Sequence, residues 1–166
     1  MNDVRDTAGV IAPPPLIALA ALVLGLTFDR LLPAYVLTVL LSLPERIVIG
    51  ALLLVVSAGL AIPALLAFRA AGTHVEPWKP SSVVVTDGIF AWLRNPMYVG
   101  LIMGLAGLSV LLASDWTLVM TAIVAPVLHF GVVKREERYL EAKFGDAYRG
   151  YKARVPRYGW PPAGSA

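Results

Sequence analysis

The chain has 166 residues, a formal net charge of +3, no cysteine and 58% hydrophobic residues. Soluble domains contain roughly 45–50% apolar residues, so this composition and a mean hydropathy of +0.73 indicate one small integral membrane domain rather than a water-soluble protein. The lack of cysteine excludes disulfides, thiolate metal sites and cysteine nucleophiles, and two distant histidines do not form a metal-ligand set.

The first part of the chain predicts two membrane spans with a short apolar run between them. Residues 1–7 lack the basic start of a cleaved signal and three prolines follow, so we expect this stretch to be retained. Residues 11–28 and 47–68 are uncharged over 18 and 22 positions, close to the roughly 20 that cross a bilayer as a helix. The 13-residue run 31–43 is too short to span comfortably, so it is expected to be interfacial or packed on the bundle.

Two further spans are predicted over residues 97–113 and 116–133, with only Ser114-Asp115 between them. So short a connection folds the two helices back antiparallel, which brings the start of one beside the end of the other. In this register Arg94 is expected to face Glu136 at one membrane surface. We therefore place the candidate active site where these two polar clusters meet.

Basic residues predict the orientation of the four spans. Eleven of the fourteen Lys and Arg lie in the loop before residue 97 or in the tail after residue 133, so that side is expected to be cytoplasmic, with both termini. The charge therefore reports membrane topology and not nucleic-acid binding. We expect one domain over residues 1–166, with N-terminal helices at 11–68 and a catalytic region at 72–157.

The tail, residues 134–155, is predicted to be an amphipathic helix with one aromatic and apolar stripe and a weak point at Gly145. It could lie on the membrane surface or form a lid over the end of the hairpin. Either way, the expected fold is all-α: about four transmembrane helices plus a C-terminal amphipathic helix.

The residues at the predicted meeting point admit a structural and a functional interpretation. Asn95-Pro96 suits a capped helix start that favours an anion, and Arg94 adds a positive charge, although a snorkelling arginine explains the same pattern. Glu136 and Glu137 either pair with Arg94, Lys134 or Arg135, or bind an ammonium or hydroxyl group of a ligand.

Further along the two helices, His129 lies in an apolar run and Tyr98 is one turn inside the facing helix. An ionisable residue at that depth suggests function, but a neutral histidine bonded to a backbone carbonyl is the alternative. Gly100 and Gly104 have the small-xxx-small spacing of close helix packing. His74 has no evident partner and is expected on the surface.

The pattern of residues 94–100, followed by two spans, Glu136-Glu137, Phe144-Gly145, Tyr148, Tyr151 and Val155, resembles the isoprenylcysteine carboxyl methyltransferase and phospholipid methyltransferase superfamily. The resemblance covers about residues 72–157. It implies an integral membrane enzyme that uses S-adenosylmethionine, with a cofactor pocket formed by the last two spans and the C-terminal helix. The lipophilic acceptor would enter from the bilayer.

By position, the resemblance implies that Arg94 lies near the acceptor and that residues at the hairpin end border the cofactor. Asn95 stands where eukaryotic members have histidine. The aromatic faces of the tyrosines suit a sulfonium by cation–π attraction of about 0.5–2 kcal/mol, and a carboxylate such as Glu137 suits proton removal from an amine acceptor. The predicted site is therefore Arg94 and Glu137 as catalytic residues, with Asn95, Tyr98, Gly100, His129, Glu136, Glu137, Tyr148 and Tyr151 around the cofactor.

Two other functions stay open from the sequence. The chain could be a reductase, because some sterol reductases resemble this superfamily, although no nicotinamide-phosphate site is evident. It could also be a non-catalytic membrane scaffold or transport subunit in which Arg94, His129 and Glu136 form a buried ion network. The acceptor atom and the oligomeric state are not determined by the sequence.

Overall fold

A computed structural model describes residues 6–159, and all regular secondary structure in this part of the chain is helical. This confirms the expected all-α class. Most of the expected retained N-terminal stretch, residues 1–7, and the Pro-rich end lie outside the described residues.

Helix α1 spans Pro14–Leu31, three residues later than the predicted run at both ends. It begins at Pro14 because proline fits the first turn, where its missing N–H has no partner to lose. The predicted run ends at residue 28, just before Asp29-Arg30, but both of these residues are helical. The reason is tertiary: the carboxylate of Asp29 accepts hydrogen bonds from the hydroxyl of Ser114 and the backbone N–H of Trp116.

The short apolar run after α1 forms a five-residue helix, α2 (Val36–Leu40). The two backbone N–H groups at its start, of Val36 and Leu37, each donate to a carboxylate oxygen of Asp115 at 2.9 Å. Leu37 is buried beneath it. The run is therefore packed on the end of the bundle, one of the two expected placements.

Helix α3 spans Leu43–Ala70 and is longer at both ends than the predicted span. Its start is a capping box, in which the side chains of Ser42 and Glu45 satisfy each other's backbone N–H groups. The helix continues through Pro63. It leads into the connecting loop, residues 71–95, which contains the single 3-10 turn η1 (Gly88–Ala91).

Helices α4 (Pro96–Leu112) and α5 (Asp115–Leu128) form the predicted hairpin. The turn is Ala113-Ser114 rather than Ser114-Asp115, because Ala113 adopts the left-handed conformation (φ 52°) and Ser114 caps α5 through the N–H of Thr117. The α5 helix then passes into a π-helical turn, η2 (His129–Val133), and continues as α6 (Lys134–Phe144).

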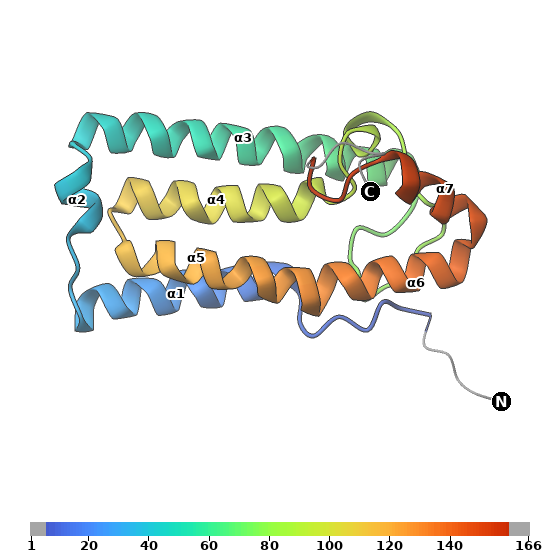
Figure 1. Ribbon diagram of the computed structural model, residues 1–166, viewed down its shortest axis with the longest axis horizontal. Helices are drawn as coiled ribbons and strands as arrows, with labels where there is room; N and C mark the ends of the chain where they lie inside the picture. Colours follow the sequence, from blue (N-terminus) through green and yellow to red (C-terminus); the bar gives the residue numbers. More distant parts are fainter. Residues whose placement is uncertain (1–5, 160–166) are drawn as a thin grey trace.

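The predicted tail helix is broken at the expected weak point. Gly145 has φ 56° and ψ −126°, a conformation that L side chains rarely adopt, and it separates α6 from α7 (Asp146–Arg154). The chain reverses there, so α7 folds back toward the start of α4 (Figure 1).

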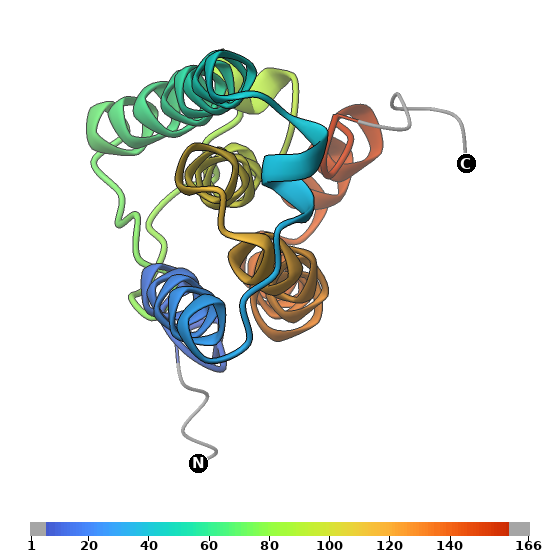
Figure 2. The same cartoon turned by 90° about the vertical axis from the view of Figure 1, so that its left-hand side faces the viewer.

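The four long helices run side by side, with α2 crossing one end and the loop, α6 and α7 gathered at the other (Figure 1). Viewed along the bundle, α4 lies inside, between α3 and the pair α1 and α5 (Figure 2). The core fills the space between α1, α4 and α5 with small and branched apolar side chains, namely Ala18, Ala21, Leu105, Val124, Leu128 and Val132.

Three stretches are long and apolar enough to cross a membrane: Pro14–Leu31, Leu43–Ala70 and Asp115–Phe144. The fourth predicted span, α4, is apolar but has only 17 residues. At 1.5 Å per residue it is about 25 Å long, slightly less than the roughly 30 Å of hydrocarbon.

Helix α4 packs most closely on α3, and not on its hairpin partner. A Cβ on Gly107 would lie 3.0 Å from the carbonyl oxygen of Gly50, and a Cβ on Gly100 would lie 3.0 Å from that of Ser57. The Ser57 hydroxyl also donates to the Gly100 carbonyl at 2.7 Å. The expected glycine packing is therefore present, and its partner is α3.

Candidate functional site

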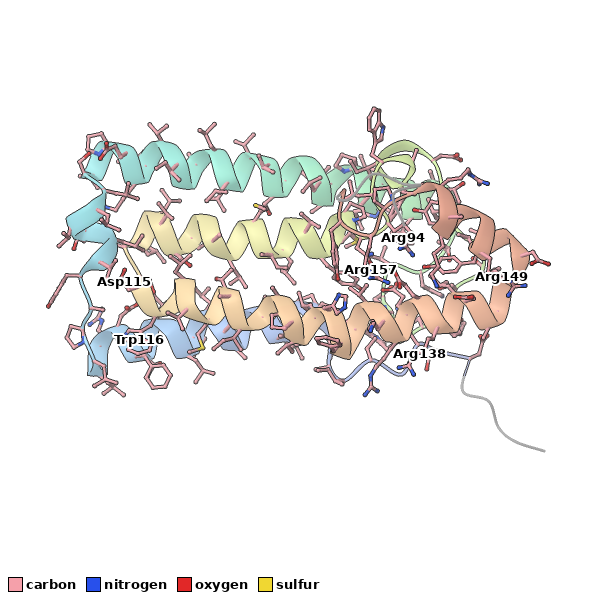
Figure 3. All side chains as sticks on the ribbon, in the orientation of Figure 1. Arg94, Asp115, Trp116, Arg138, Arg149 and Arg157 are labelled. Carbon is pink, nitrogen blue, oxygen red and sulfur yellow. The ribbon has the colours of Figure 1, made fainter. Side chains whose placement is uncertain are left out.

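A cavity opens at the end of the bundle where the loop, α6 and α7 gather. Arg94 and Arg157 lie at this end (Figure 3). The cavity has a volume of about 70 Å³ and is open at its mouth. Helix α3 contributes Phe68 from its last turn, the loop 71–95 forms one side, and α4, α6 and α7 provide the rest. Seven predicted site residues line it: Arg94, Asn95, Tyr98, Glu136, Glu137, Tyr148 and Tyr151.

Glu137 is held between two arginines that come from opposite directions in the sequence. Its Oε1 lies 2.9 Å from Nη1 of Arg94 and accepts from Nε of Arg157 at 2.8 Å, while its Oε2 accepts from Nη2 of Arg157 at 2.7 Å. The Arg94 and Glu137 side chains are each only 8% exposed. The hairpin therefore brings the two polar clusters together as predicted. The partner of Arg94 is Glu137, however, whereas the predicted register paired it with Glu136.

Arg94 keeps donor capacity despite this pair. Its Nη1 is close to Glu137 without the alignment of a hydrogen bond, so the contact is an ion pair, and its Nε has no hydrogen-bond partner among residues 6–159. A buried donor of this kind is costly unless something binds it. Arg94 is thus suited to a further anionic group in the cavity.

Glu136 has a different environment. Its Oε2 accepts a hydrogen bond of 2.9 Å from the hydroxyl of Tyr98, and within the described chain no Lys, Arg or His lies within salt-bridge distance of it. The two neighbouring carboxylates are thereby distinguished: Glu137 is neutralised by arginines, whereas Glu136 is available to a cation or a hydroxyl group.

The start of α4 provides the backbone groups expected to favour an anion, but Asn95 does not cap it as predicted. Its side-chain amide instead donates to the carbonyl of Arg157 at 3.1 Å, and the N–H of Arg94 donates to the carbonyl of Pro156 at 3.0 Å. The side-chain amide of Asn95 therefore holds the segment after α7 instead of capping α4. The first amides of α4 are therefore left without a side-chain cap, and Pro96, Met97 and Tyr98 line the cavity.

Tyr148 and Tyr151 close the cavity from α7, and both are buried. The Tyr151 hydroxyl donates to the carbonyl of Phe90 in the loop at 2.7 Å. Burial, reinforced by the nearby charge of Glu137, raises the pKa of Tyr148, and burial likewise raises the pKa of Tyr151. Both tyrosine side chains therefore stay neutral. Because both line the cavity, α7 covers it on this side.

Two predicted site residues do not line the cavity. Gly100 faces α3, as described above, and His129 lies on the π-helical turn with its Nδ1 2.8 Å from the hydroxyl of Tyr158. His129 lies seven residues before Glu136, which in a regular α-helix is two turns away on the same face. The π turn changes the helical phase between them, so the two side chains point to different places.

The structure also adds residues that the sequence analysis did not select. Arg157 follows α7 and reaches Glu137 because the chain reverses at Gly145. The sequence analysis treats it only as one of the basic residues of the tail. His74 and Glu76 of the loop line the cavity mouth, with His74 Nδ1 4.0 Å from a Glu76 oxygen, whereas His74 was expected to be a surface residue without a partner. The expected surface position is correct, because the His74 side chain is exposed, whereas the expected lack of a partner is not.

These features define a class: a helical membrane domain with a charged, aromatic-lined cavity at one end of its bundle. The family model described as phospholipid methyltransferase matches residues 45–147, which is more than half of the chain, and the cavity residues from His74 to Glu137 lie within the match. The chain belongs to the phospholipid methyltransferase family.

Individual relatives agree with this membership. Protein-S-isoprenylcysteine O-methyltransferase of Schizosaccharomyces pombe is 35% identical over 74 residues, 45% of this chain and 31% of the relative. The protein of the same name from Mus musculus is 36% identical over 73 residues, 44% of this chain and 26% of the relative. The matches therefore span less than a third of these two relatives.

A bacterial relative matches over nearly its whole length. An uncharacterized protein of Haemophilus influenzae is 37% identical over 62 residues, 37% of this chain and 98% of the relative. No solved structure matches the chain.

Proposed function

We propose that this protein is an integral membrane methyltransferase that uses S-adenosylmethionine and methylates a lipophilic acceptor, either a carboxylate or a phospholipid amine. The observation that carries the proposal is the convergence of Arg94, the uncapped start of α4, Glu136 and Tyr148 on one cavity. Family membership and relatives named O-methyltransferases support it. We further infer four spans, with the cavity and both termini on the cytoplasmic side.

The residues of the cavity fit the charges of the cofactor. Its carboxylate suits the guanidinium of Arg94, which lines the cavity, and the first amides of α4. Its ammonium or ribose hydroxyls suit Glu136, which has only Tyr98 as a hydrogen-bond partner within residues 6–159. The neutral aromatic rings on α7 suit the sulfonium.

When bound, S-adenosylmethionine supplies a methyl carbon already activated toward displacement by its sulfonium. In the overall transfer, a lone pair of the acceptor forms the new bond to this carbon as the carbon–sulfur bond breaks, and the thioether leaves. Because the leaving group needs no help, the protein contributes mainly position and exclusion of water. Helix α7, with Tyr148 and Tyr151 buried against the loop, serves both purposes.

The geometry also supports a proposal of different roles for the two glutamates. An amine acceptor must lose a proton, whereas a carboxylate acceptor has none to lose. Both oxygens of Glu137 are already engaged by arginines, so Glu137 holds Arg94 in place. Glu136 is the better proton acceptor of the two, and we favour it over Glu137, the choice from sequence, for that role.

Calorimetry of the detergent-purified protein tests cofactor binding. We expect wild type and Glu141→Gln to bind S-adenosylmethionine, and Glu136→Gln to bind it at least tenfold more weakly. Glu141 is a matched control because it lies on the same helix and pairs with Lys152 at 2.9 Å, away from the cavity. Binding of NADPH alone would favour the reductase alternative, and binding of neither ligand would favour a non-catalytic membrane subunit.

A second assay identifies the acceptor class. The protein is incubated with methyl-labelled cofactor and a membrane lipid extract, and the labelled product is treated with base. A methyl ester releases labelled methanol, whereas an N-methyl group keeps the label on the lipid. An absence of lipid labelling by a protein that binds the cofactor would contradict a lipid acceptor.

A further inference from the structure

A second groove lies on the other side of Glu137 from the cavity. It runs between α6 and α7, and its floor includes Glu137 and Arg157, which also form the ion cluster of the candidate site. Phe130, Lys134, Arg138 and Lys152 line the rest together with Glu141. The clamped carboxylate of Glu137 therefore separates two cavities with different linings.

The groove carries an excess of positive charge. Of its four basic residues, Lys152 pairs with Glu141 at 2.9 Å and Arg157 pairs with Glu137 at 2.7 Å. Lys134 and Arg138 have no carboxylate within 4.0 Å in the part of the chain that the structure describes. Lys134 lies 5.3 Å from the centre of the Phe130 ring, and Arg138 donates only to a carbonyl of its own helix. Two cations thus remain for an anionic ligand.

The groove lies where an apolar helix face ends. Upstream on α5, Val119 and Ile123 are 45% and 49% exposed, and Phe130 at the edge of the groove is 62% exposed. In a bilayer this face contacts acyl chains. The uncharged part of the stretch ends at residue 133, so Lys134 and Arg138 follow it at the level of the lipid headgroups. A ligand that matches both features has a phosphate at one end and hydrocarbon at the other.

We propose that the groove between α6 and α7 binds the phosphate-bearing headgroup of an anionic phospholipid whose acyl chains lie along the exposed face of α5. This site goes beyond the proposed methyl transfer, because the Arg94–Glu137–Arg157 cluster separates it from the cavity. Lys134 and Arg138 contact the phosphate, and Phe130 packs against the first part of the chains.

The test measures the thermal midpoint of the purified full-length protein in detergent micelles with added lipid. Phosphatidylglycerol is compared with phosphatidylcholine, and a third arm contains glycerol phosphate, the soluble headgroup without chains. The test variant is Lys134→Gln/Arg138→Gln. The control, Arg149→Gln/Arg154→Gln, removes the same charge from exposed positions on α7 that do not line the groove.

We expect phosphatidylglycerol to raise the midpoint of wild type and of the control, and phosphatidylcholine and glycerol phosphate to have little effect. In Lys134→Gln/Arg138→Gln the apparent affinity for phosphatidylglycerol should fall by roughly thirtyfold, from the usual contribution of a basic residue near an anionic surface. The charge-conserving Lys134→Arg/Arg138→Lys should retain binding, which separates loss of charge from loss of folding.

An equal response of the test variant and wild type to phosphatidylglycerol would overturn the proposal. So would an equal response of wild type to the two lipids, because it would show no preference for an anion. If glycerol phosphate alone reproduced the shift, the groove would be a site for a free phosphate compound and not for a lipid.

Discussion

At the residue scale, the candidate site depends on one carboxylate between two guanidinium groups. Burying Arg94 and Glu137 removes two charges from water, and their attraction compensates for this only while both remain. Arg157 has a 30% exposed side chain and adds two hydrogen bonds to Glu137, which raise the pKa of Arg157. The loss of Glu137 should therefore be more damaging than the loss of Arg157.

We predict that Glu137→Gln lowers the free energy of unfolding by about 3–5 kcal/mol, because it leaves the guanidinium of Arg94 buried without a counter-charge. Arg157→Gln should cost less, because Arg94 still neutralises the carboxylate. Thermal unfolding in detergent, followed by circular dichroism, measures both. Glu141→Gln is the control and should change stability by at most about 1 kcal/mol; an E137Q protein as stable as this control would contradict the prediction.

The sequence contained part of this site. The antiparallel hairpin correctly predicted that residues near 94 and 137 meet, because a tight turn fixes the register of two helices within about one residue. The predicted partner of Arg94 was Glu136 and the observed partner is Glu137, so the predicted register is wrong by one residue. Arg157 could not be found in this way, since its position depends on the reversal of the chain at Gly145, and no spacing rule spans such a turn.

At the scale of the elements, the close contact of α3 and α4 fixes the position of the site. Helix α4 carries Tyr98 in its first turn and directly follows Arg94 and Asn95, and glycines along its length allow its backbone to approach α3 directly. Such contacts stabilise helix pairs in membranes through van der Waals packing. A side chain inserted here would push α4 away from α3.

We predict that Gly107→Ala lowers stability by about 1–3 kcal/mol through overpacking. The new Cβ would meet the Gly50 carbonyl at 3.0 Å and Leu54 at 3.1 Å. Gly59→Ala on α3 is the matched control: nothing lies within 4 Å of its Cβ, so it should be neutral or stabilise by about 0.5–1 kcal/mol. Equal midpoints for the two variants in thermal unfolding would show that the helices tolerate separation.

The positions of the long helices were largely predictable, because uncharged runs of this length are typical of membrane-spanning helices. The residues at which each helix begins and ends were harder to predict. Asp29 stays helical, and its carboxylate accepts hydrogen bonds from Ser114 and Trp116, which lie 85 and 87 residues later. The capping box of Ser42 and Glu45 was readable from the sequence and was missed, which is why α3 begins at Leu43 and not at residue 47. The π turn of α5 moved His129 away from the cavity, and helical periodicity alone does not reveal such a turn.

At the scale of the whole molecule, charge is unequally divided between the two ends of the bundle. Figure 3 shows Arg94, Arg138, Arg149 and Arg157 at one end and Asp115 and Trp116 at the other. The positive-inside rule predicts that the arginine-rich end faces the cytoplasm, as proposed above. This assignment requires that α4, despite its 17 residues, crosses the bilayer by local thinning or by snorkelling of its flanking residues.

We predict opposite labelling of the two ends by a membrane-impermeant maleimide in intact cells. The chain has no cysteine, so single substitutions report cleanly. Thr38→Cys on α2 should be labelled from outside, and Arg149→Cys on α7 only after the membrane is opened; both residues are exposed. Labelling of both positions from the same side would show that α4 and α5 do not cross the bilayer as a hairpin.

The path of residues 6–13 has a consequence for the order of assembly. Ile11 donates its N–H to the carbonyl of Gly131 on the π turn, Arg135 binds the Gly9 carbonyl 126 positions away, and Tyr139 reaches Asp6 across 133 positions. During synthesis these partners emerge last, whereas α3 and α4 can pair much earlier. Since distant contacts form slowly, docking of the leading segment should be a late event in maturation, and the end of the bundle that carries the candidate site should become protease-resistant only after α5, α6 and α7 are complete.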